Sequence, residues 1–301
     1  MALITRATLP DLLWPGIQAI FGTTYDKLPK EYTRIFETRK SNKAYEKLLE
    51  ATGMGLASVK AEGASITYDS PGQGPSNILT HVTYGLGYIM TREAEEDNQY
   101  QEVAEANAAA LPWSMWSTKE TVHANILNRA WTAAYAGGDG QELVSADHVT
   151  ANGTQSNLLT AADLSESSLE DALTTVHTAK NSAGLAIALR ATRLIVAPAQ
   201  LYNATRILES AQQSGSADND VNAIKTLGLV PEIVVNHYLD DTDAWFLQTN
   251  APNGLISYQR RALALEKDND FDTENKKYKA TERYSAGWGD FRAIYGNQGA
   301  G

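Results

Sequence analysis

The sequence contains no cysteine among its 301 residues. A disulfide framework, a thiolate metal site and any mechanism with a cysteine nucleophile are therefore excluded. This absence is compatible with a reducing cytoplasm. There is also no apolar run near the ~18 residues that a membrane span requires, so we expect no membrane association. The first residues, MALITRATLPDLLWPG, lack the basic start, continuous apolar centre and cleavage site of a signal peptide, which predicts that they are mature sequence.

Positive charge is in deficit. The chain has 25 Lys and Arg against 36 Asp and Glu, which gives a net charge of -11. Residues 1–50 carry eight basic and six acidic side chains, so the remaining residues carry 17 against 30, or -13. An acidic body argues against tight binding to a phosphate backbone, because that affinity comes mainly from Lys and Arg. The first segment is either a basic arm that reaches a neighbouring copy or an ordinary fluctuation of composition.

Motifs that bind metals are missing as well. The five histidines show no ligand spacing, so core, surface or capping roles are expected for His81, His123, His148, His177 and His237. The run DNDFDTE from Asp268 imitates the start of a calcium loop, but Thr273 replaces the required glycine and Lys279 the bidentate glutamate. Asp240, Asp241 and Asp243 indicate a solvated turn rather than a carboxylate site.

Glycine motifs that bind phosphates or activate nucleophiles are also absent. GMG at 53–55 and GQG at 72–74 lack the third glycine of a dinucleotide site, and no GxSxG elbow occurs. We therefore predict no catalytic, cofactor-binding or metal-ligating residue, no cofactor, and no enzyme activity. A carboxylate-dependent hydrolase stays as a distant alternative, because 36 acidic residues always offer some suitable pair.

The first half of the chain shows two kinds of periodicity. Residues 1–30 are broken by proline and glycine, which predicts an extended arm. Residues 31–51 place apolar side chains every three to four positions, which predicts one or two amphipathic helices ending at Gly53. Residues 78–90 then show a two-residue repeat, and together with a weaker ascending half at 56–68 they predict a long β-hairpin over 55–90 with the tip DSPGQGPSN at 69–77. Such a hairpin has little surface to bury by itself and needs a partner.

Helical patterns follow. Acidic residues at 93–97 open a long helix whose single apolar face continues to Gly137, bent or interrupted at Pro112. Residues 137–163 indicate a loop. Ser167 with Glu170 forms a predicted capping box for a helix that ends near Lys180.

The second half alternates strands and helices. RLIVAPAQLYNATRILES at 193–210 predicts a buried strand, a proline turn and an amphipathic helix, and residues 210–222 predict a mobile loop. PEIVVNHYL and AWFLQTN predict two strands joined by the turn DDTD at 240–243. Strand-like runs continue to the end, where Trp288, Phe291, Ile294 and Tyr295 form a bulky last strand. The length predicts two subdomains.

This order of elements resembles the major capsid proteins of tailed bacteriophages, with the Hong Kong phage type of shell fold and some likeness to Mu-type head subunits. The resemblance spans nearly the whole chain. The residues that carry it are RLIVAPAQLYNATRILES, PEIVVNHYLDDTDAWFLQTN and the end YKATERYSAGWGDFRAIYGNQGAG.

The resemblance implies an α+β fold with five parts. These are an N-terminal arm and helix (1–54), an extended β-hairpin arm or E-loop (55–90), a peripheral domain with a spine helix (91–180), an axial domain (181–243), and strands returning to the axial and peripheral domains (244–301). Trp288 to Tyr295 would form the last strand of the peripheral sheet, held by the spine helix. The loop at 210–222 would lie where subunits converge around an axis.

The resemblance also implies the function and the partners. The chain would be a structural head protein that self-assembles through hexamers and pentamers into an icosahedral shell, made in the bacterial host cytoplasm and located in the virion capsid. It would enclose double-stranded DNA without sequence-specific binding. A portal protein, a decoration protein and a separate scaffolding protein are the implied partners, the last because no scaffold segment precedes the arm. An encapsulin-like shell around a protein cargo is the nearest alternative.

Overall fold

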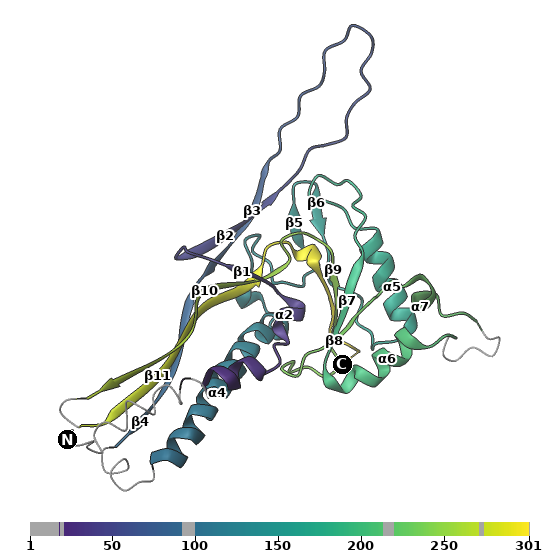
Figure 1. Ribbon diagram of the computed structural model, residues 1–301. Coiled ribbons are helices and arrows are strands. Elements are labelled where there is room, and N and C mark those ends of the chain that lie inside the picture. Colours follow the sequence, from purple (N-terminus) through teal and green to yellow (C-terminus); the bar gives the residue numbers. More distant parts are fainter. Residues whose placement is uncertain (1–17, 19–20, 92–99, 213–219, 271–273, 301) are drawn as a thin grey trace, which may run out of the picture.

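Two four-stranded sheets form the body of the protein, and a two-stranded arm projects from it (Figure 1). The computed structural model describes residues 18, 21–91, 100–212, 220–270 and 274–300, without the side chains of 51 and 100–109. Residues 21–27 are helical and precede the single turn α2 (Tyr32–Ile35).

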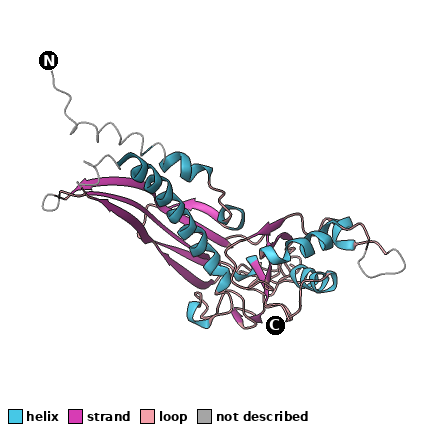
Figure 2. Ribbon diagram, turned by 90° about the horizontal axis from the view of Figure 1, so that it is seen from below, coloured by secondary structure: helices cyan, strands magenta, loops and turns pink. Residues whose placement is uncertain are grey.

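The first sheet is long and carries the helix α4 (Tyr100–Asn128) along one face (Figure 2). Its strand order is β1-β10-β11-β4, with β1 parallel to β10 and the other pairs antiparallel. Aromatic pairs stiffen it, since the Tyr88 ring stacks on Tyr278, its cross-strand partner, with centroids 5.0 Å apart. The strands are β1 (Glu37–Lys40), β4 (Val82–Met90), β10 (Leu255–Asn269) and β11 (Lys276–Trp288).

The second sheet is compact, is buried on both faces and has the order β12-β9-β7-β8. Side chains alternate between two cores: Leu194 and Leu247 face one, while Ile195 and Phe246 face the other. This explains the continuous apolar runs in these strands, which would alternate with polar residues if one face met water. The strands are β7 (Ala191–Val196), β8 (Ile233–Val235), β9 (Trp245–Thr249) and β12 (Ile294–Asn297).

Helices cover one face of the compact sheet, and α2 with the end of α4 covers the other. On the helical side, α5 begins at a capping box of Ser165 and Ser168, two residues before the predicted pair Ser167 and Glu170. That prediction was wrong because the Ser168 hydroxyl, not a carboxylate, bonds the N-cap backbone. The helices are α5 (Glu166–His177), η3 (Pro198–Gln200), α6 (Leu201–Glu209) and α7 (Ala223–Leu227).

Short elements connect the two sheets. The predicted loop 137–163 contains a small hairpin, and a further short helix precedes the last strand. These elements are η2 (Ala133–Tyr135), β5 (His148–Thr150), β6 (Gly153–Gln155) and η4 (Phe291–Ala293).

The predicted helices over 31–51 are wrong. Only the turn α2 forms, and the chain then enters β1 and β2 (Tyr45–Ala51). Backbone pairing of β1 with β10 and of β2 with β3 (Gln73–Thr80) decides the conformation, and such tertiary pairing overrides a helical spacing of side chains.

The arm exists, but its predicted bounds, 55–90, and tip, 69–77, are wrong. It runs from Tyr45 to Thr80, and its far end is the turn at Ala61–Ala64, where Gly63 has a φ of 76°. Beyond His81 the chain changes partner, and β4 pairs with β11 in the long sheet. The two-residue repeat continues through this change of partner, so the repeat alone could not locate it.

Two further predictions need correction. α4 is continuous across Pro112, so of the predicted bend or interruption the interruption is wrong. The last strand is Ile294–Asn297 and joins β9 in the compact sheet, not the sheet under α4, while Trp288 closes β11. The strand, proline and helix predicted over 193–210 are confirmed as β7, η3 and α6, and the strands flanking the DDTD turn as β8 and β9.

Several predictions fall outside the described residues. They are most of the N-terminal arm, the acidic start of the long helix at 93–97, positions 213–219 of the predicted mobile loop, and positions 271–273 of the calcium-like run.

The last strand should contribute strongly to stability. Ile294 is fully buried between the compact sheet and the end of α4. Replacing Ile294 by Ala should lower the free energy of unfolding of the unassembled subunit by about 2–5 kcal/mol, because a cavity replaces packed methyl groups. Urea titration measures this. Ile89, which is 62% exposed in β4, gives the matched control, and Ile89→Ala should cost far less. Equal losses at both positions would contradict the burial of the last strand.

Candidate functional site

The arm exposes large apolar side chains that a soluble chain normally buries. Beyond β2 and β3, residues 52–72 form a long loop that extends away from the body (Figure 1). Val59 is 99% exposed, Tyr68 90% and Leu56 84%. Burying one such side chain contributes roughly 1.5–3 kcal/mol, so a partner that covers the loop would gain this free energy for each side chain that it buries. An exposed apolar surface of this kind marks an interaction site.

The two sides of the loop are held together by polar contacts. Thr52 and Gly72 exchange hydrogen bonds, and the Gly55 N–H donates to the Asp69 carboxylate at 2.8 Å. Further out, the Ser58 and Thr67 hydroxyls lie 3.0 Å apart. The glycine pairs at 53–55 and 72–74 therefore lie at the base of the loop, where they shape a paired ribbon rather than a phosphate site.

The β3 side of the arm is anchored on the end of the long sheet. The Asn77 side-chain amide donates to the Trp288 carbonyl at 2.8 Å. Gly138 lies so close to Ser76 that a Cβ there would sit 2.2 Å from the Ser76 carbonyl oxygen. Only glycine allows this approach.

The β2 side is anchored by Arg292, whose side chain is 2% exposed. Its guanidinium donates to Glu50 at 2.8 Å, to Asp290 at 3.1 Å and to the Lys180 carbonyl at 2.8 Å. It also donates to the Gln155 amide oxygen and the Ser182 hydroxyl. Burial raises the pKa of Asp290, against the opposing pull of Arg292. Four segments of the chain, at residues 50, 155, 180–182 and 290–292, therefore meet at this side chain.

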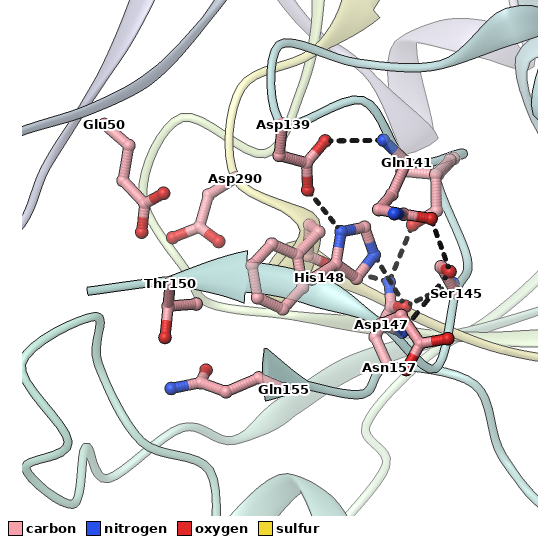
Figure 3. Close-up of polar contacts among 12 residues, drawn as sticks. Glu50, Asp139, Gln141, Ser145, Asp147, His148, Thr150, Gln155, Asn157 and Asp290 are labelled. Carbon is pink, nitrogen blue, oxygen red and sulfur yellow. Dashed lines mark hydrogen bonds and ion pairs between the residues drawn. The ribbon is translucent and has the colours of Figure 1, made fainter. Parts of the chain in front are cut away.

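A second buried network lies beside this cluster (Figure 3). The ring nitrogens of His148 face Asp139 at 2.6 Å and the Asn157 amide oxygen at 3.1 Å. Burial opposes the charge of Asp139, but hydrogen bonds from His148 and the Gln141 N–H hold its pKa below the usual range. The His148 ring is stacked on Phe291, with centroids 3.9 Å apart, and is fully buried. The buried His148 ring, held by Asp139 and stacked on Phe291, positions the chain before the last strand.

The contact between α4 and the long sheet contains a third set of buried polar groups. Lys119 forms an ion pair with Glu282 of β11, and His123 hydrogen-bonds Ser257 of β10 at 2.7 Å. The Glu120 carboxylate accepts the Tyr32 N–H at 3.0 Å. Burial raises the pKa of Glu120 to about 7 and lowers the pKa of His123 to about 4.

The histidines and the aspartate cluster that were considered as possible metal or catalytic residues lie apart from one another and have structural contacts. His81 contacts Ser41 and Ser285, and His237 contacts Glu31. The DDTD segment is an exposed turn, in which the Asp241 carboxylate accepts the N–H groups of Asp243 and Ala244. Of these, His81 lies at the body end of the arm, directly after β3.

Within the described ranges, no group of three or more His, Asp or Glu side chains could hold a metal ion. Of the helices that the structure describes, none is both long and apolar enough to cross a bilayer.

The exposed loop and its anchors were partly missed by the sequence analysis. The predicted hairpin overlaps the arm, but most of the two-residue repeat that predicted it lies in β4 of the long sheet. The glycine pair at 137–138 was the available signal for a close approach of two backbones. The Arg292 cluster left no signal, because its members, Glu50, Gln155, Ser182 and Asp290 among them, are scattered along the sequence.

Comparison with known proteins identifies the kind of chain. A family model described as phage capsid protein matches residues 76–297, which is well over half of the sequence. No curated protein sequence matches.

Solved structures share the fold at low identity. A virus-like particle from Pyrococcus furiosus is similar with a TM-score of 0.54 and 12% identity, over 93% of this chain and 97% of that chain. The capsid of a native GTA particle gives 0.54 and 15%, over 91% and 92%. A structure from Mycobacterium phage Patience gives 0.56 and 11%, over 96% and 88%. The shell fold that the sequence resemblance implied is confirmed.

The buried carboxylate of Glu120 should make stability depend on pH. Its pKa is raised in the folded state, so the folded chain binds a proton more tightly than the unfolded chain between about pH 4.5 and about 7. The free energy of unfolding should therefore fall as pH rises through this window, by about 1–3 kcal/mol from this group. Urea titrations at several pH values should show that Glu120→Gln removes this loss.

The control variant changes a carboxylate that is exposed in the folded chain. Glu62 lies exposed on the arm loop, so Glu62→Gln should leave the pH profile of the wild type unchanged. Equal pH slopes for Glu120→Gln and wild type would show that Glu120 is ionised without penalty in the folded chain.

Proposed function

The chain belongs to the phage capsid protein family, and from this we propose the way in which it builds a shell. It is a structural shell protein. Its place is the virion capsid, and its role there is structural rather than enzymatic. Many copies join through their arms, and hexamers and pentamers of the chain close an icosahedral shell.

The observation that carries this proposal is the apolar loop at 52–72. Its side chains are exposed in the single chain, although the body has buried cores on both sheets. A second copy can cover that loop, and the reciprocal contact then repeats around a ring. The ribbon is too thin to bury these side chains against itself.

The parts of the chain take the following roles in this proposal. Residues 45–80 form the E-loop arm. The long sheet with α4 as spine helix forms the peripheral domain. The compact sheet with α5, α6 and α7 forms the axial domain. β9 and β12 return to the axial domain, and β10 and β11 to the peripheral domain.

Double-stranded DNA is the proposed content of the shell. The family match favours a phage genome over the protein cargo of an encapsulin-like shell and over a carboxylate-dependent hydrolase. A net charge of -11 is compatible with a shell wall that encloses DNA and does not bind its phosphates tightly. A separate scaffolding protein, a portal protein and a decoration protein are the proposed partners, and synthesis is proposed in the cytoplasm of the bacterial host.

Removing the apolar character of the arm should abolish assembly and leave the subunit folded. We expect the triple variant Leu56→Ser, Val59→Ser and Tyr68→Ser to melt like the wild type, because these side chains are exposed and support no core. Sedimentation velocity and negative-stain microscopy, with the scaffolding partner present if one is required, should then show unassembled subunits where the wild type forms shells.

A matched control lies on the same loop. Lys60→Ala combined with Glu62→Ala removes two charged side chains, keeps the net charge and leaves the apolar side chains in place. This control should assemble. Normal shells from the triple variant would rule out the arm as the assembly contact.

A further inference from the structure

We infer that Arg292 is a positioning residue that fixes the direction of the arm through Glu50, and that this direction sets the angle at which copies join. The second part rests on the proposed function, because it concerns the arm through which copies would assemble. The first part concerns the single chain and stands on its own contacts.

Arg292 is fully engaged. Its Nε donates to Gln155 at 3.1 Å and to the Lys180 carbonyl at 2.8 Å. One terminal nitrogen donates to Glu50 and Asp290, and the other to Gln155 and Ser182. A guanidinium holds its donors in one rigid plane, so these contacts fix the relative positions of their acceptors. A side chain that donates this many directional hydrogen bonds holds the residues around it in one arrangement.

Glu50 is the member of this cluster that comes from the arm. It precedes the last residue of β2, at the point where the ribbon leaves the body. The Ser182 hydroxyl also donates to its carboxylate. Gln155, Lys180, Ser182 and Asp290 all belong to the body. The Glu50–Arg292 ion pair therefore connects the arm to the body.

The Glu50–Arg292 ion pair is one of several contacts that hold the base of the arm. On the other strand, Asn77 bonds the Trp288 carbonyl. Contacts on both strands of a ribbon prevent it from rolling about either one. The loop beyond them has about ten residues on each side, or roughly 30 Å at about 3.3 Å per residue. A rotation of about 10° at the base would then move the tip by roughly 5 Å, enough to change which surface it meets.

The Glu50–Arg292 ion pair can be removed without leaving the buried guanidinium of Arg292 unpaired. Arg292 faces two carboxylates, from Glu50 and Asp290. Removing Glu50 leaves Asp290 to neutralise the buried guanidinium, whereas removing Arg292 would leave two carboxylates uncompensated. Glu50→Ala therefore separates the direction of the arm from the stability of the body.

The test measures the arm directly in unassembled subunits. Because the chain has no cysteine, Val59→Cys on the arm and Thr175→Cys on α5, both at exposed positions, provide two unique sites for spin labels. Pulsed electron paramagnetic resonance then gives the distribution of distances between them. Glu50→Ala should at least double the width of this distribution, while thermal unfolding stays cooperative.

A matched control lies on the same strand. Glu46 contacts Lys43 at 3.1 Å and Ser41 at 2.7 Å, both within the turn that precedes β2. Glu46→Ala should leave the distance distribution as in the wild type. In assembly reactions Glu50→Ala should yield shells of mixed diameter or open sheets, where Glu46→Ala yields uniform shells.

The outcomes separate the two parts of the inference. An unchanged distance distribution in a cooperatively folded Glu50→Ala subunit overturns the role of Arg292. A broadened distribution together with uniform shells overturns the link to assembly angle. If Glu50→Ala does not fold, Glu50→Gln, which keeps the shape and loses the charge, should broaden the distribution by a smaller factor, and no broadening overturns the inference. Failure of the wild type to form any shell would count against the proposed function and leave the spectroscopic result standing.

Discussion

The ion pair of Lys119 and Glu282 holds α4 on the long sheet, and the placement of the other parts depends on that contact. β11 pairs with β10 on one side and β4 on the other, so a helix fixed on β11 is fixed on the whole sheet. Two buried charges are expensive to desolvate, and here the Tyr32 and Tyr284 rings, 5.2 and 5.0 Å from the Lys119 ammonium, help to offset it. The second oxygen of Glu282 has no hydrogen-bond partner among the described residues, so the pair is retained at some expense in stability.

The compact sheet is buried on both faces, and its last strand explains the bulky residues near the end of the sequence. Ile294 and Tyr295 face opposite cores, so β12 closes both of them at once. Asn157 reinforces this closure, since its amide donates to the carbonyls of Leu143, Phe291 and Ile294. A last strand that is buried on both faces and bonded from outside the sheet has little freedom to fray.

The sequence predicted elements whose pattern is local and failed where partners are distant. β7, the proline turn and α6 form one continuous apolar and amphipathic stretch, and were correctly predicted. Residues 37–51 have helical spacing, yet they become strands because β10 and β3 offer edges to pair with. The predicted hairpin overlaps the arm, but its two-residue repeat runs through His81 into β4, so it gives no sign that the strand changes partner there from β2 to β11. The anchor at Arg292 joins residues separated by up to 242 positions and has no periodicity to detect.

The division of apolar surface between body and arm has a consequence for how copies join. The body buries apolar cores within one chain, whereas the loop at 52–72 leaves its large apolar side chains exposed and, in the proposed assembly, buries them against a second copy. In the proposed ring, each copy would offer one arm and receive one, so every added contact would form at high effective concentration once the first has formed. If each arm contact is weak by itself, a misplaced copy that has made only one contact can dissociate. The contacts of a closed ring act together and keep it assembled. A stiff arm base serves this sequence of events, because an arm that already points in the right direction loses less conformational freedom when it docks.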